Sequence, residues 1–168
     1  MKILGEKSLS SKVIVGLNIL FTIISIVDIV VLSVIIKIIK HIVMGENIQN
    51  NISDLIFFLM IISTGIIALF IIYQFIKIFK NLKIDILFCE DNAKSLNVVS
   101  YSCFIISALY LVIAIFIFSI MRNLVGNYIC AFSIILMIIF VVSGVGIKIL
   151  NEIYKKAIEY KEENDFTI

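Results

Sequence analysis

A row of polar side chains interrupts an apolar run near the N-terminus and is the first place where the sequence could support chemistry. Asn18, Thr22, Ser25 and Asp28 are spaced four, three and three residues apart, which places them on one face of a helix. No other charged residue occurs between residues 13 and 36. A charged side chain at the centre of a bilayer costs about 2.5–3.5 kcal/mol on insertion scales. We therefore expect this face to point toward other helices, with Asp28 either neutral or well partnered.

Three hydroxyls are expected at a similar depth. Asp28 lies eight residues before the outer end of its apolar run, or about 12 Å at 1.5 Å per residue. Ser63 and Thr64 are about as deep in the second apolar run, and Tyr110 is slightly deeper in the third. No Lys or Arg is expected at this depth, so we predict that Asp28 is protonated and hydrogen-bonded to these hydroxyls.

Two interpretations of Asp28 stay open at this point. Intramembrane acids are functional candidates by default, which would make Asp28 a proton or cation site. The other interpretation is a neutral polar contact that fixes helix packing. A proton relay generally uses several ionisable groups, whereas the four apolar runs hold one acid. This difference favours the packing interpretation.

The elements that must position these residues follow from the hydrophobicity of the chain. Of its 168 residues 62% are hydrophobic and 15% charged, against about 45–50% and about 25% in soluble domains. A helix needs about 20 apolar residues to cross a bilayer, and β-barrel strands would instead alternate in segments of about 10 residues. The sequence therefore predicts an all-α integral membrane four-helix bundle in the cell membrane, with residues 1–168 forming one domain. The predicted spans are residues 13–36, 55–76, 98–121 and 128–150.

The distribution of Lys and Arg predicts the orientation of this bundle. The N-terminal tail, the second connection and the C-terminal tail together contain 11 of the 14 basic residues, and the other two connections contain three. Because basic residues are retained in the cytoplasm, we expect both termini and the second connection to be cytoplasmic. Four crossings also place the two termini on the same side.

Helical extensions are predicted at the cytoplasmic ends of the second and fourth spans. Residues 77–88 alternate apolar side chains with lysines, which is typical of a helix leaving the membrane. Ile153, Ala157 and Tyr160 recur at helical spacing, which predicts an amphipathic extension over residues 151–163. This extension could pack on the first one, lie at the lipid surface or bind a partner.

Motifs of catalysis and cofactor binding are missing from the sequence. It contains no nucleophile paired with a base, paired-carboxylate site, phosphate-binding glycine loop or zinc motif, and its three cysteines lack metal-ligand spacing. We therefore predict that the protein is not an enzyme and uses no cofactor or metal. The net charge of +2 is too small to suggest direct nucleic-acid binding.

Two short stretches resemble a known family. They are the segment 88–96, with Phe88, Asn92 and Leu96, and the tail 157–168, with Asn164, Asp165 and Phe166. Both are similar to small bacterial four-helix membrane proteins, common in Gram-positive bacteria, that are defined only as a domain of unknown function. Leu87 stands where many of those proteins have Pro or Gly, so a helical turn is allowed there. Both stretches are expected on the cytoplasmic side, which makes them a candidate interaction surface.

This resemblance extends over the whole chain in layout and implies no catalytic residues. Members of the family are often encoded beside a small helix-turn-helix regulator, which implies a membrane partner in regulation or stress response. The leading hypothesis is a non-enzymatic bacterial membrane protein, such as a sensor, a regulator-linked factor or an immunity-type factor. Besides the lipid bilayer, its expected partner is a cytoplasmic regulator or a second copy of the chain. The alternative is a small transporter or channel subunit that uses Asp28.

Overall fold

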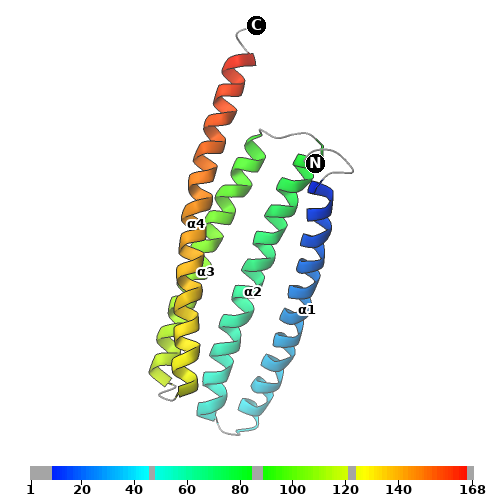
Figure 1. Cartoon of the computed structure of the whole chain (residues 1–168). Helices are drawn as coiled ribbons and strands as arrows, with labels where there is room; N and C mark the ends of the chain where they lie inside the picture. The colour runs from blue at the N-terminus through cyan, green and yellow to red at the C-terminus, as the bar shows by residue number, and fades with distance from the viewer. Residues whose placement is uncertain (1–8, 46–47, 85–88, 121–123, 166–168) are drawn as a thin grey trace.

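Four long helices account for almost all of the structure (Figure 1). The computed structural model describes residues 9–45, 48–84, 89–120 and 124–165. Each helix is long and apolar enough to cross a membrane, and the described residues include no strand, which confirms the predicted all-α class. The helices are α1 (Leu9–Val43), α2 (Ile48–Lys83), α3 (Glu90–Ile120) and α4 (Leu124–Asp165).

The helices pack in chain order. Close backbone contacts join α1 to α2, α2 to α3 and α3 to α4, and no other pair of helices in the described structure makes them. Consequently α1 and α4 are the two edges of the bundle (Figure 1). Among the described residues, α3 contains most of the buried side chains. Both edge helices expose large apolar side chains, such as Ile29 on α1 and Val142 on α4. These exposed surfaces suit a lipid environment.

The closest approach of α3 and α4 depends on small residues. The Ser100 hydroxyl donates a hydrogen bond of 2.8 Å to the backbone carbonyl of Gly144. A Cβ built on Gly144 would lie 3.1 Å from the Phe104 ring and 3.3 Å from the Cβ of Cys103. Small residues let helix backbones approach closely in membranes, where packing and interhelical hydrogen bonds replace the hydrophobic driving force. Gly144 therefore positions α4 against α3.

The helix α4 is longer than the helix it packs against. Its beginning lies beside the end of α3, where the Cys130 thiol is 3.6 Å from the Ala114 carbonyl oxygen. Tyr154 lies beside the first turn of α3, where its hydroxyl accepts a hydrogen bond from the Asn92 amide. Residues 156–165 therefore continue past the start of α3, as the red end of the ribbon in Figure 1 shows. We call residues 156–165 the α4 projection; its cytoplasmic location stays a prediction.

Candidate functional site

Asp28 lines a cavity of about 280 Å³ to which all four helices contribute. Its other polar lining residues are Thr64 on α2 and Tyr110 on α3. The rest of the lining consists of Gly65 and Ala68, four Ile and Val side chains from α1, α2 and α3, and Phe140 of α4. Three of the four residues proposed for an intramembrane polar site thus meet at one cavity, whereas Ser63 is not part of its lining.

The Asp28 carboxyl group lies against the backbone of Gly65. A Cβ at position 65 would overlap the carboxyl atoms of Asp28, so glycine leaves the space that this carboxyl occupies. Its Oδ2 atom is buried and has no hydrogen-bond partner in the described structure. A buried polar atom without a partner is costly, and each such atom requires an explanation.

The expected hydrogen bonds to Asp28 are not formed. Ser63 donates to the Met60 carbonyl and Thr64 to the Ile61 carbonyl, both at 2.7 Å. A Ser or Thr hydroxyl in a helix readily reaches the carbonyl three or four residues earlier, and no water competes for it in an apolar segment. The prediction is wrong for Ser63 and Thr64 because their own helix satisfies these two hydroxyls.

The other polar residues of the N-terminal row also bond within α1. Thr22 donates to the Ile19 carbonyl at 2.7 Å and Ser25 to the Phe21 carbonyl at 2.8 Å. Asn18 is exposed. The row therefore does not converge on one interhelical site, and only Asp28 reaches the cavity.

An aromatic pair forms one wall of the cavity. The rings of Tyr110 and Phe140 are stacked, with centroids 5.9 Å apart and an angle of 13° between their planes. The faces of aromatic rings carry partial negative charge, which attracts cations. The cavity thus combines an unpartnered carboxyl group, an aromatic wall and an otherwise aliphatic lining.

A second polar cluster joins three helices near the beginning of α3. The Asn81 amide donates to the Asn92 side-chain oxygen at 2.7 Å, and the Asn92 amide donates to the Tyr154 hydroxyl at 3.1 Å. The side chain of Asn92 is only 1% exposed. Asn92 was expected in an interaction surface, and the structure instead shows it linking α2, α3 and α4 from inside the protein.

The other residues of the predicted interaction surface are described only in part. Leu96 is half-buried on α3. Phe88 and Phe166 lie outside the described residues, as do the side chains of Asn164 and Asp165.

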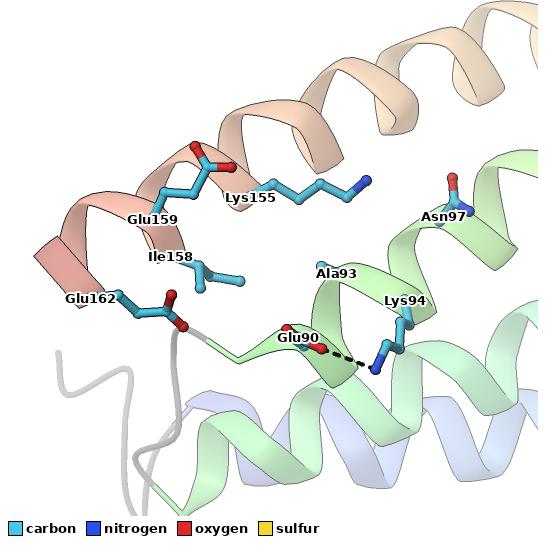
Figure 2. Close-up of a pocket in the computed structure, with 8 residues that line it drawn as sticks. All are labelled: Glu90, Ala93, Lys94, Asn97, Lys155, Ile158, Glu159 and Glu162. Carbon is cyan, nitrogen blue, oxygen red and sulfur yellow. Dashed lines mark hydrogen bonds and ion pairs between the residues drawn. The ribbon is translucent and has the colours of Figure 1, made fainter.

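A groove of about 290 Å³ lies between the first turns of α3 and the end of α4 (Figure 2). In Figure 2, Glu90 and Ala93 of α3 lie across this space from Ile158 and Glu162 of α4, and the Lys94 side chain points toward Glu90. We call it the α3–α4 groove; its lining is Glu90, Ala93, Lys94, Asn97, Lys155, Ile158, Glu159 and Glu162.

Carboxylates outnumber lysines in this groove. Its lining includes three glutamates and two lysines. The Lys94 ammonium donates to Glu90 at 3.1 Å, and this hydrogen bond raises the pKa of Lys94 above its ordinary value. The groove was not predicted from the sequence, although Lys155, Glu159 and Glu162 follow the spacing of one helix face.

A protein-family model matches most of the chain, and the match includes all of the α3–α4 groove and part of the cavity around Asp28. The model of a family described as Protein of unknown function (DUF2975) matches residues 44–168, which include α2, α3 and α4. No match was found among curated proteins or among solved structures. Thr64, Gly65 and Tyr110 lie within the matched range, and Asp28 lies before it.

Proposed function

Because the chain belongs to the DUF2975 family of proteins of unknown function, whose description assigns no activity, we propose a function from the geometry of the chain itself. In this proposal it is a non-enzymatic, multi-pass membrane protein that binds a cytoplasmic regulator. The binding surface is the α4 projection together with the α3–α4 groove. The observation that carries the proposal is that α4 continues past α3 as a charged helix with an acidic groove at its base.

The distribution of charge supports a cytoplasmic position for this surface. The beginning of α1, the end of α2, the beginning of α3 and the end of α4 lie at the same end of the bundle (Figure 1). This end corresponds to the connections and tails that contain 11 of the 14 basic residues. Basic residues of short loops are retained on the cytoplasmic side.

The exposure of the α4 projection supports a partner. Lys156, Glu159, Tyr160 and Lys161 are exposed, and Tyr160 is 66% exposed. In proteins most of the stability of a helix comes from tertiary packing of one face, and this segment has such packing only at its base. Tyr is enriched at protein interfaces, where its ring is buried and its hydroxyl keeps a polar contact. A partner that packs on the α4 projection would bury its exposed face and supply the tertiary packing that stabilises a helix.

A non-enzymatic role is supported by the sequence, which provides no nucleophile with a base and no paired carboxylates within the apolar runs. The choice of a regulator as the partner rests on the resemblance to proteins encoded beside a small helix-turn-helix regulator. The acidic groove would suit a partner with a basic surface, and DNA-binding regulators have such surfaces.

Co-purification in a mild detergent tests this proposal. The full chain is co-expressed with a helix-turn-helix regulator of the kind often encoded beside members of the family, and it is captured by an affinity tag. The double variant Glu159→Lys and Glu162→Lys reverses two charges of the groove and should reduce the captured regulator at least tenfold. Glu152→Lys, an exposed change on the same helix outside the groove, is the matched control and should leave capture unchanged. Equal capture by all variants, or none by the unaltered protein, would contradict the proposal.

The second candidate function is a small transporter or channel subunit. The observation that favours it is the unpartnered Oδ2 atom of Asp28 in a cavity between the four helices. Flux of protons or cations across vesicles that contain the protein, measured with and without Asp28→Asn, tests this candidate. Flux that persists unchanged in the folded variant would rule out a role for Asp28.

A further inference from the structure

We propose that the cavity around Asp28 binds a small lipophilic cation, an ammonium group with an apolar body, whose charge pairs with the Asp28 carboxylate. This inference goes beyond the proposed regulator binding and does not depend on it. The cavity lies within the apolar part of the bundle, whereas the α3–α4 groove lies at its end.

The lining of the cavity excludes other classes of ligand. The described residues that line it include no Lys, Arg or His, so none of them would compensate the charge of an anion. Hard inorganic cations such as Ca²⁺ require about six to eight oxygen ligands. The side chains provide only the Asp28 carboxyl and the hydroxyls of Thr64 and Tyr110. A desolvated metal ion would therefore stay under-coordinated.

An organic ammonium ion fits the same lining. Its substituents would contact the aliphatic side chains, which favour the burial of apolar surface. Its positive charge would lie near the Asp28 carboxylate and could contact the face of the Tyr110–Phe140 pair. The volume of about 280 Å³ admits a cation with one ring, and it is just below the range of about 300–1,000 Å³ for small-molecule pockets.

Binding of such a cation would release a proton. Without a counter-charge the carboxyl group is expected to be neutral, because ionised groups are costly in an apolar surrounding. When the cation enters, the proton leaves Asp28 for the solvent, and the net charge of the cavity stays the same. The groups that face Asp28 are Thr64 and Gly65 from α2, Tyr110 from α3 and Phe140 from α4, of which only Tyr110 is titratable. Affinity should therefore increase with pH.

Isothermal titration calorimetry of the full chain in detergent tests the proposal, with benzyltrimethylammonium as the probe. Titrations in two buffers of different ionisation enthalpy should show up to one proton released per cation bound. Asp28→Asn should weaken binding at least tenfold, and Phe140→Leu several-fold. Ser33→Ala is the matched control on α1: this exposed hydroxyl donates to the Val30 carbonyl and does not line the cavity, so binding should be unchanged.

A neutral molecule of the same shape provides a test that needs no variant. Neopentylbenzene replaces the charged nitrogen of the probe by carbon and should bind at least tenfold more weakly to the unaltered protein. Equal binding of both molecules, or equal affinity of the folded Asp28→Asn variant for the cation, would overturn the proposal. If this variant fails to fold, the comparison of the two molecules decides. Capture of the regulator should be the same with and without the probe, so the two proposals fail separately.

Discussion

The carboxyl group of Asp28 occupies the space in which a side chain at position 65 would begin, so the packing of α1 on α2 depends on glycine at that position. This relationship explains how the one acidic side chain of α1 fits between two apolar helices. It also makes the contact testable from either side, because each of the two residues can be changed separately.

Gly65→Ala should destabilise the protein, because the added Cβ would collide with Asp28. We expect a loss of about 1–3 kcal/mol, as for other over-packed interiors. The double variant Asp28→Ala and Gly65→Ala should lose less than the sum of the two single variants, since removal of the carboxyl makes room for the Cβ. Gly16→Ala on α1 is the control: its Cβ would meet no atom within 4 Å, so stability should be unchanged or slightly higher. Thermal unfolding in detergent measures all four variants, and additive losses would contradict the contact.

Two glycines of α4 should respond differently to alanine. Gly144→Ala would place a Cβ 3.1 Å from the Phe104 ring, so α3 and α4 should separate slightly, with a loss of about 1–2 kcal/mol. Gly146→Ala would meet nothing within 4 Å and should be neutral or stabilising by up to about 1 kcal/mol. Melting temperatures that shift equally for both would show that the close approach at Gly144 does not matter for stability.

Replacement of Asn92 should break the link between α2, α3 and α4. Asn92→Leu leaves the Asn81 amide and the Tyr154 hydroxyl without these hydrogen bonds, at a cost of about 1–3 kcal/mol. Asn97→Leu, on the same helix but lining the groove, should change stability by less than about 0.5 kcal/mol. Hydrogen exchange should increase at the end of α2 and the beginning of α3 in the first variant alone. An unchanged exchange rate there would mean that the chain of hydrogen bonds contributes little.

Replacement of a second buried asparagine, Asn151, should stabilise the protein, whereas replacement of Asn92 should destabilise it. Asn151 is 1% exposed, and neither its side-chain oxygen nor its nitrogen has a hydrogen-bond partner in the described structure. Asn151→Leu keeps a similar shape and removes two unsatisfied polar atoms, so unfolding should require about 1 kcal/mol more free energy. A lower melting temperature in detergent would show instead that the Asn151 amide has a partner in the folded protein, such as a bound water molecule.

The orientation of the bundle can be tested with single cysteines on a background without Cys89, Cys103 and Cys130. Cysteines at the exposed positions Met44 and Asn127 should react with an impermeant maleimide added to intact cells. Cysteines at Ile84 and Glu163, also exposed, should react only after the membrane is opened. This pattern follows from the excess of basic residues at the end of the bundle where α1 begins and α4 ends. Labelling of the cysteine at position 163 in intact cells would show that the orientation is the reverse of the predicted one. It would also remove the basis for a cytoplasmic partner.

The sequence by itself determined the number and type of the elements. The thickness of a bilayer requires about 20 apolar residues per crossing, so the four apolar runs specify four helices before any packing is known. Helical periodicity past Leu150 also predicted that the fourth helix continues, and α4 ends at Asp165. That this part of α4 lies outside the membrane stays a prediction. These features are local, since each depends only on consecutive residues.

Only the tertiary structure decided which side chains meet. Lipid tails are as apolar as Leu or Ile, so hydrophobicity does not reveal which face of a membrane helix is buried against protein. For this reason Gly65 and Gly146 look alike in the sequence, although a Cβ at position 65 would overlap Asp28 and a Cβ at position 146 would meet nothing within 4 Å. For the same reason the hydroxyls expected around Asp28 could not be assigned in advance: the carbonyls of their own helix compete for them, and only the packed structure shows which partner each hydroxyl has taken.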